Sequence, residues 1–173
     1  MRALHWALPS LIAVTLASVQ QPAMAQKPSF REPSAPGSPI LFWRLGALNN
    51  SGPRQPILEV IQDEERWKSI WGVLYATHIH ENYIRAPQPP KIDFSREVIV
   101  VLALGQRGSG GHAIQATSVL HGQDRTEIIV RRQAPGEGCA VTLAFTYPVD
   151  IIRMEIPSKP IAILTEDVTV NCK

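Results

Sequence analysis

The sequence has almost no excess of charge of one sign, and this excludes one large class of partner. Its 173 residues carry 17 Lys and Arg against 15 Asp and Glu, a formal net charge of +2. Arg2 is the only charged residue in segment 1–25, so the chain without that segment has a charge of +1. Nucleic-acid binding requires a basic stripe, which this nearly neutral chain lacks. We therefore expect no nucleic-acid partner.

The sequence also lacks a hydrophobic run that is long enough to span a membrane. The mostly apolar run from Ala7 to Val19 is too short for this. A small-x-small peptidase site follows it at 23–25, and Gln26 stands where a lipid anchor would need cysteine. An uncleaved signal anchor is the alternative interpretation. We predict a signal peptide over 1–25 and a periplasmic or secreted product without a membrane anchor.

Cysteine is scarce, with only Cys139 and Cys172 in the chain. In an exported protein an even number of cysteines is compatible with a disulfide. This disulfide would close a loop of roughly 34 residues and stabilise the fold by about 3–4 kcal/mol. Two unpaired thiols are the alternative.

The part of the chain that follows the predicted signal peptide divides into a leader and one domain. Residues 26–39 contain four prolines separated mainly by small and polar residues. Such a segment buries little apolar surface, so we predict a disordered leader. Residues 40–173 are long enough for a single domain with its own core.

One amphipathic helix is predicted, over 63–75. Asp63 is a suitable N-cap, and the apolar stripe consists of Trp67, Ile70, Trp71 and Leu74. The two tryptophans would anchor the helix to a sheet; a ligand-binding aromatic box is the alternative. Short apolar segments between Gly and Pro punctuation predict strands at 40–46, 56–61, 97–105, 112–120, 126–133, 140–146, 149–156 and 167–171. The pattern indicates a mainly β (α+β) fold, an antiparallel β-sandwich or open barrel with one helix packed on it.

The glycine-rich stretch GQRGSGGHAI at 105–114 invites a catalytic interpretation, which its residue types exclude. Gly111 and His112 stand where a phosphate-binding loop needs Lys and Ser/Thr. Arg107 stands where a nucleophile elbow around Ser109 needs its first glycine. Neither motif is followed by the helix that it requires. The glycines are better explained by positive φ angles where one strand reverses into the next.

The remaining polar residues offer no second chemistry. His78 and His80 could begin a zinc or copper site, but no spacing ties His112 or His121 to them. We therefore expect no metal and no cofactor. The carboxylates show no spacing typical of a paired acid and base and are interpreted as surface groups: Asp93, Glu97, Asp124, Glu137 and Asp150.

Several motifs in order resemble the PrcB-like family, the protease stability complex PrcB-like domain. The sequence IDFSREVIVVLALGQR (92–107) is similar to the family's strand and glycine turn, and APGEGCAVTLAFTYP (134–148) is similar to its P-G-x-G-C-x-V-T segment. Trp67 and Trp71 match its W-x-x-x-W helix. The family has P-T-G-G-Y at the turn, whereas this chain has Gly108 and Ser109 for Pro-Thr and His112 for the aromatic residue.

The resemblance implies an exported, non-enzymatic accessory domain that binds an envelope protein, with a protease as the candidate partner. The implied binding loop is Arg107, Gly108, Ser109, Gly110, Gly111 and His112. The alternative is a loop-wedge protease inhibitor, since chagasin-type inhibitors use a turn between two strands in this way. Neither interpretation fixes the oligomeric state.

Overall fold

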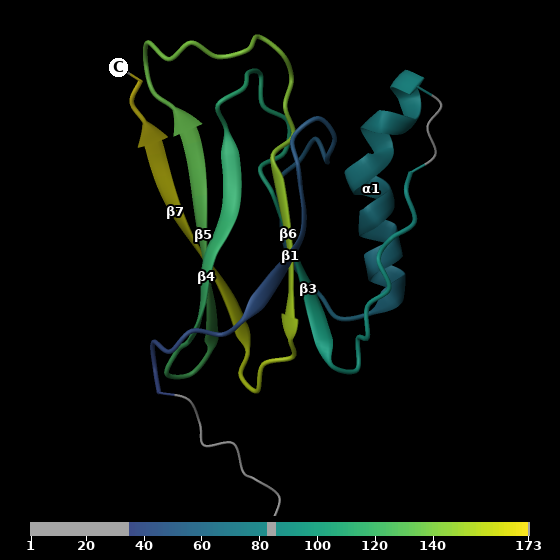
Figure 1. Ribbon diagram of the computed structural model, residues 1–173, viewed down its shortest axis with the longest axis vertical. Coiled ribbons are helices and arrows are strands. Elements are labelled where there is room, and N and C mark those ends of the chain that lie inside the picture. The colour runs from purple at the N-terminus through teal and green to yellow at the C-terminus, as the bar shows by residue number, and fades with distance from the viewer. Residues whose placement is uncertain (1–34, 83–85, 173) are drawn as a thin grey trace, which may run out of the picture. The chain divides into compact units, whose positions relative to one another are not determined.

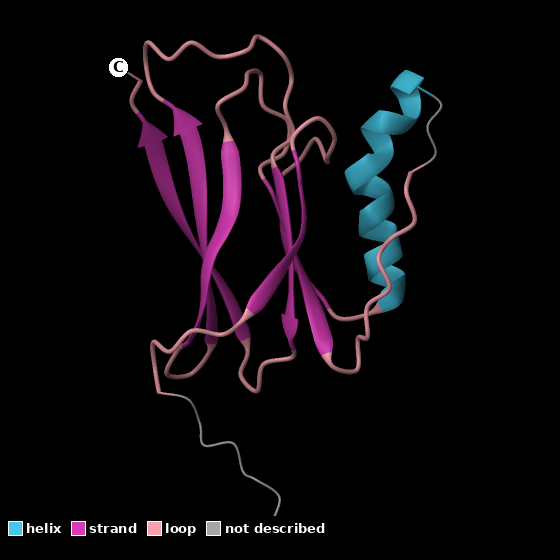
Figure 2. Cartoon of the chain, viewed as in Figure 1, coloured by secondary structure: helices cyan, strands magenta, loops and turns pink. Residues whose placement is uncertain are grey.

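The protein is a three-layer arrangement of one helix and two β-sheets (Figure 2). The computed structural model describes residues 35–82 and 86–172, and for 76–82 it describes the backbone alone. One sheet, sheet 1, has the strand order β1-β6-β3-β2, and the other, sheet 2, has the order β4-β5-β7. The strands are β1 (Phe42–Leu48), β2 (Ile57–Ile61), β3 (Glu97–Ala103), β4 (Ala113–His121), β5 (Thr126–Pro135), β6 (Val149–Glu155) and β7 (Ile161–Val170). Helix α1 (Glu64–Asn82) covers the face of sheet 1 that points away from sheet 2 (Figure 1).

Helix α1 begins where its sequence predicts. The Arg66 N–H donates to Asp63 Oδ1 at 2.7 Å, so Asp63 is the N-cap. All four residues of the predicted stripe are buried against sheet 1. The Trp67 and Trp71 indole N–H groups donate to the carbonyls of Pro90 and Pro87, at 3.0 and 2.7 Å. The two tryptophans therefore anchor the helix to the sheet and hold the proline-rich connection that follows it.

The longest apolar run of the sequence forms strand β3, and both faces of this strand are buried. Val98, Val100 and Leu102 point into the core between the two sheets. Ile99 and Val101 point into the core beneath α1. A central strand with two buried faces has no polar alternation, which is what EVIVVLA shows.

The expected fold class is confirmed, since the chain is mainly β with two sheets and one helix and forms no closed barrel. One pairing departs from the antiparallel expectation. Strand β7 begins at Ile161, six residues before its predicted start, and lies parallel to β5. The chain reaches β7 through β6 of the other sheet, and this long crossover makes the parallel pairing sterically feasible.

Two segment predictions need correction or restriction. The strand predicted over 140–146 does not form; that segment is a loop with one isolated bridge, between Thr146 and Arg107. At the other end of the chain, the last residues of the predicted leader are paired with β4. The Gly37 N–H donates to the His121 carbonyl at 2.6 Å, and the His121 N–H donates to the Ser38 carbonyl at 2.9 Å. The predicted signal peptide lies outside the described residues.

Candidate functional site

The glycine-rich loop connects the two sheets and is not a hairpin turn. It leaves β3 in sheet 1 and enters β4 in sheet 2, so the two strands that it joins are not paired with each other. Its first and last turns do need glycine, since Gly105 and Gly111 have φ angles of 76° and 81°. A Cβ on Gly105 would lie 2.7 Å from the Arg54 carbonyl oxygen, so no larger residue fits there.

A second loop, residues 136–146, holds the glycine-rich loop in place. Arg107 and Thr146 exchange two backbone hydrogen bonds, at 2.8 and 3.0 Å. The Gly110 N–H donates to the Thr142 carbonyl at 2.9 Å, and the Thr146 hydroxyl donates to the Ser109 carbonyl at 2.8 Å. We call the two loops together, residues 105–112 and 136–146, the loop end. Because four hydrogen bonds join them, the loop end is one braced surface and not two independent turns.

The side chains predicted to bind are partly engaged inside this surface. The Arg107 guanidinium donates to the Leu104 carbonyl at 3.0 Å, and its Nε is buried. The Ser109 hydroxyl donates to the neighbouring Gly110 carbonyl at 3.2 Å, so it is not activated by a base. His112 is half-buried, and this burial, with a smaller contribution from the charge of Arg107, lowers the pKa of its imidazole. Both effects favour the neutral form of His112.

The glycines of the loop differ in what they present to solvent. Gly108 and Gly111 are exposed, whereas Gly110 is buried. A Cβ on Gly110 would collide with the Thr142 hydroxyl, and one on Gly111 would lie 3.0 Å from Pro135. Only Gly108 has open space around it. The glycine-rich loop thus supplies backbone surface and close packing, and few free side chains.

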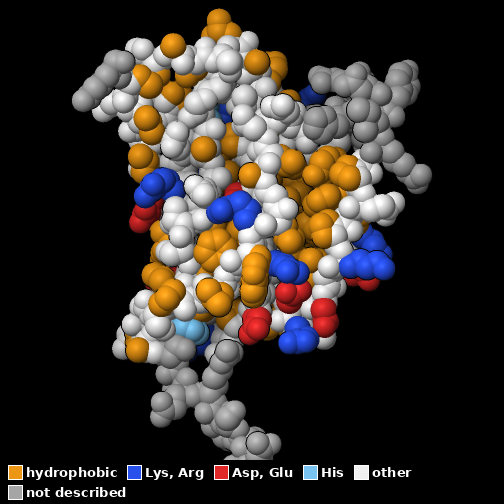
Figure 3. Space-filling model, viewed as in Figure 1, with side chains coloured by type: hydrophobic (Ala, Val, Ile, Leu, Met, Phe, Trp, Pro, Cys, Tyr) orange, Lys and Arg blue, Asp and Glu red, His pale blue; other side chains and the backbone are white. Residues whose placement is uncertain are grey.

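Two large apolar side chains are exposed on loop 136–146, in the segment whose sequence predicts a strand. Leu143 is 94% exposed and Phe145 is 67% exposed. Segment 138–148 contains no charged residue. In Figure 3, hydrophobic side chains gather at the upper end of the view, where Figure 1 places this loop. The sequence shows these residues as part of the apolar segment 140–146, which lies between Gly and Pro punctuation and therefore predicts a strand.

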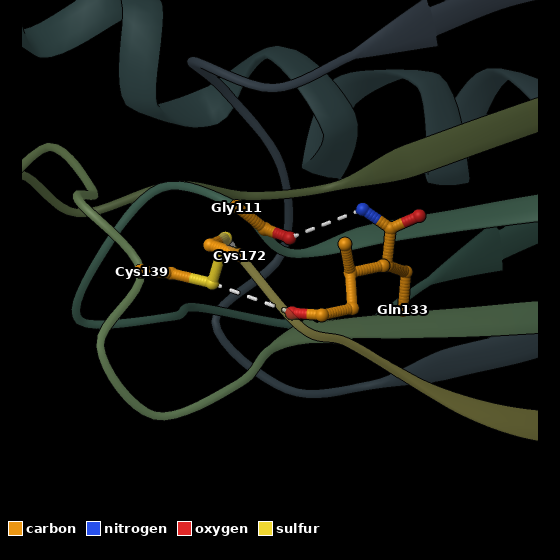
Figure 4. Close-up of a disulfide and its surroundings, with 5 residues drawn as sticks. Gly111, Gln133, Cys139 and Cys172 are labelled. Atoms are coloured by element: carbon orange, nitrogen blue, oxygen red, sulfur yellow. Dashed lines mark hydrogen bonds between the residues drawn. A yellow bond between two sulfur atoms is a disulfide. The ribbon is translucent and has the colours of Figure 1, made fainter.

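The disulfide fixes one side of this loop. Cys139 and Cys172 are bonded, with their Cα atoms 5.0 Å apart, so the expected pairing is present (Figure 4). The Gly136 N–H donates to the Val170 carbonyl at 2.8 Å, next to the bond. On β5, the Gln133 side-chain amide donates to the Gly111 carbonyl of the glycine-rich loop at 3.5 Å. The loop end is therefore tied both to the end of β5 and to the end of β7.

The other candidate residues are not drawn into the site. The side chains of His78 and His80 lie outside the described residues. Within the part of the chain that the structure describes, no group of three or more His, Cys, Asp and Glu residues could hold a metal ion. In that same part, no helix is both long and apolar enough to cross a membrane.

One of the carboxylates interpreted as surface groups is not at the surface. Asp150 on β6 is only 1% exposed. Its carboxylate accepts hydrogen bonds from Arg44 Nε at 2.5 Å and from the Ala116 N–H at 2.8 Å. It connects β6 of sheet 1 to β4 of sheet 2 across the interior of the sandwich. The interpretation of Asp150 as a surface group is therefore wrong.

The described chain is a two-sheet β domain with one packed helix and a braced, apolar loop end. Residues 98–155 of this domain, from β3 to the end of β6, match the model of the PrcB C-terminal family. The match includes both loops of the loop end and confirms the family resemblance over that segment. No curated protein and no solved structure matches the chain.

Proposed function

We propose that this chain is an exported, non-enzymatic accessory domain that binds an envelope protein through its loop end. The observation that carries the proposal is the exposure of Leu143 and Phe145, 94% and 67%, on a loop held by a disulfide and by backbone hydrogen bonds. Exposed apolar side chains that gather on a rigid surface are typical of protein interaction sites. A braced loop also loses little conformational entropy on binding.

The family match supports the accessory role. PrcB-like domains are associated with proteases and have no established chemical activity of their own, and a protease is therefore the first candidate partner. The hydrogen bond of Ser109 to its neighbour also favours binding over catalysis. The disulfide supports export, because disulfides persist in oxidising compartments.

The contact residues in this proposal differ from those that the sequence indicates. The glycine turn braces the surface, and Leu143 and Phe145 act as its anchors. Substituting Gly110 or Gly111 would therefore be a poor test, because an added Cβ meets Thr142 or Pro135 and would disturb the fold itself. The informative substitutions are on the exposed side chains.

The test uses a photo-crosslinking amino acid at Ala144, the exposed residue between the two anchors. In intact cells that naturally produce the chain, we expect one envelope protein to be captured from this position and to co-purify with the chain. Leu143→Ser with Phe145→Ser should weaken co-purification by about tenfold or more, as expected for anchor residues. Leu41→Ser is the matched control, since Leu41 is 80% exposed and lies outside the loop end.

Three outcomes separate the hypotheses. Co-purification that survives the double substitution overturns the role of Leu143 and Phe145. If no envelope protein is captured at all, the accessory function is overturned. Inhibition of a protease by the purified chain, lost in the same double variant, would instead support the loop-wedge inhibitor.

A further inference from the structure

The sandwich has four strand edges, and three of them carry features that block pairing with another chain. Strand β1 has a register shift between Arg44 and Gly46, and β2 has only five residues. Strand β4 has a shift between Ala116 and Ser118, and residues 37–40 pair with its outer edge. Bulges, short strands and covering segments are the usual protections of an edge. The fourth edge, β7, has none of these.

Strand β7 is long and regular. Its ten residues pair with β5 without a register shift. No strand among the described residues lies beyond β7 in sheet 2 (Figure 1). Every residue from Thr165 to Val170 is exposed. The strand therefore presents a straight, solvent-exposed backbone over its C-terminal half.

Two hydrogen bonds show which backbone groups of β7 point away from β5. The Thr126 N–H donates to the Pro160 carbonyl, and the Gly136 N–H donates to the Val170 carbonyl, both at 2.8 Å. Because the register is unshifted between these two points, the even-numbered residues bond to β5. The outward N–H and C=O groups belong to the odd-numbered residues, which are Ile161, Ile163, Thr165, Asp167 and Thr169.

We propose that β7 pairs antiparallel with β7 of a second copy of this chain, with the two-fold axis at Thr165. The outward groups of one copy can bond only to the outward groups of the other. Odd-numbered residues must therefore lie opposite odd-numbered residues, and even-numbered residues opposite even-numbered ones. The register with Thr165 opposite Thr165 overlaps residues 161–169. In this register each of the five outward N–H groups on one copy reaches a carbonyl of the other.

The charges of β7 exclude registers that are shifted towards the C-terminus, whereas a shift towards the N-terminus shortens the overlap and loses hydrogen bonds. Moving the two-fold axis by one residue towards the C-terminus places Glu166 opposite Glu166. Moving it by two residues places Asp167 opposite Asp167. Like charges directly opposite each other destabilise a strand pair. In the Thr165-centred register, Glu166 lies opposite Leu164 and Asp167 opposite Ile163, so no like charges meet. A threonine pair on the axis is a favourable cross-strand pair.

The dimer would join the two copies of sheet 2 into one sheet with six strands. The C-terminal end of β7 lies at the loop end, because Cys172 is bonded to Cys139. Since the two β7 strands run in opposite directions, the two loop ends would lie at opposite ends of the joined sheet. Both loop ends would stay accessible. This inference is independent of the proposed function, but the two are compatible.

The test measures the mass of the purified, disulfide-bonded chain by sedimentation velocity, up to roughly 100 µM, a range that detects weak dimers. We expect a dimer whose population rises with concentration. Thr165→Lys places two like charges on the axis and should raise the dimer Kd by about tenfold or more. Thr165→Val is the matched control, because it keeps the backbone N–H and strand propensity, and it should dimerise as the unchanged chain does.

Amide hydrogen exchange tests the register directly. The even-numbered amides of β7 should be protected at every concentration, and the outward amides of Ile163, Thr165 and Asp167 only when the dimer forms. This readout does not depend on any variant folding correctly. A chain that stays monomeric at every concentration tested overturns the proposal. This holds even if a peptide of another protein binds β7 and protects the outward amides. A dimer that persists in Thr165→Lys, or leaves those amides unprotected, also overturns it.

Discussion

The two edges of sheet 2 are built in opposite ways. At the β4 edge, residues 37–40 run alongside the strand before the chain crosses to pair with β6 as β1. The Ile40 N–H donates to the Val119 carbonyl at 2.8 Å. This side of the sandwich is therefore closed by one continuous segment. The β7 edge has no such cover among the described residues, and β7 pairs with β5 on its other side alone.

The closed side also contains the ion pair between the partly exposed Arg44 and the buried Asp150. Arg44 lies at the bulge of β1, and Ala116 lies at the bulge of β4. Both contact Asp150, which accepts from the guanidinium and from the Ala116 N–H. The Arg44 guanidinium also donates to the Ala116 carbonyl at 3.0 Å. The two bulges thus lie where polar groups connect the two sheets.

The difference shows two ways of handling polar groups at an edge. On the closed side the Asp150 carboxylate is buried and each of its oxygens has a donor, so the loss of this carboxylate should be costly. On the open side, Arg132 and Asp167 form a pair in solvent, with both contacts at 2.7 Å. Exposed pairs contribute little to stability even when their geometry is good. The two sides can therefore be compared by substitution.

The largest effect is expected at Asp150. Asp150→Ala leaves the buried Ala116 N–H without its acceptor and removes the charge-assisted hydrogen bonds to the partly exposed Arg44 guanidinium, and should lower the free energy of unfolding by about 3–5 kcal/mol in all. Chemical denaturation followed by tryptophan fluorescence measures the loss. Asp150→Asn, which keeps an acceptor oxygen, should lose less. If Asp150→Ala cost as little as a surface substitution, the contrast between the two sides would be wrong.

The disulfide should have the next largest effect. Replacing both Cys139 and Cys172 with serine frees a loop that spans 33 positions of the sequence, which corresponds to about 3–4 kcal/mol in the chain-entropy model. Denaturation of the double variant should give the same loss as reduction of the unchanged chain. A double variant as stable as the unchanged chain would show that hydrogen bonds alone hold the ends of β5 and β7.

The smallest effect is expected at Asp167. Asp167→Asn should change the Tm by less than about 2 °C, measured at low protein concentration. Arg132 lowers the pKa of the Asp167 carboxyl, mainly through their hydrogen bond. The pair therefore stabilises the fold above the unfolded pKa of about 3.9 and loses this contribution as the pH falls through the lower folded pKa. The unchanged chain and the variant should then become equally stable in acid. A difference that persists there would assign the effect to something other than ionisation.

Local patterns predict much of this fold. The N-cap and stripe of α1 place its first turns correctly, and the continuous apolar run of β3 indicates a central strand. The helix nevertheless continues to Asn82, seven residues beyond the predicted end. Segment 140–146 predicts a strand because it is short, apolar and bounded by Gly and Pro. Such a segment forms a strand only if a partner strand is available, and this one bonds to a loop.

The missed features depend on contacts between residues that are distant in the sequence. Nothing near Pro160 shows that Ile161 pairs with Thr126 in a parallel register. The burial of Asp150 depends on bulges in two other strands. Both loops of the loop end lie within the segment that matches the family. The resemblance implies the glycine turn as the binding loop, whereas the exposed side chains of Leu143 and Phe145 lie in the neighbouring motif.

The bond between Cys139 and Cys172 also determines how the domain would carry mechanical load. It closes a covalent ring that contains β6 of one sheet and β7 of the other. A pull applied beyond Cys172 would be transmitted to Cys139 through the sulfur atoms, so it would not peel β7 away from β5. The force would be delivered at the base of the loop that carries Leu143 and Phe145. Tension on this end of the chain would therefore load the loop end and the adjoining end of β5 before it loads β7.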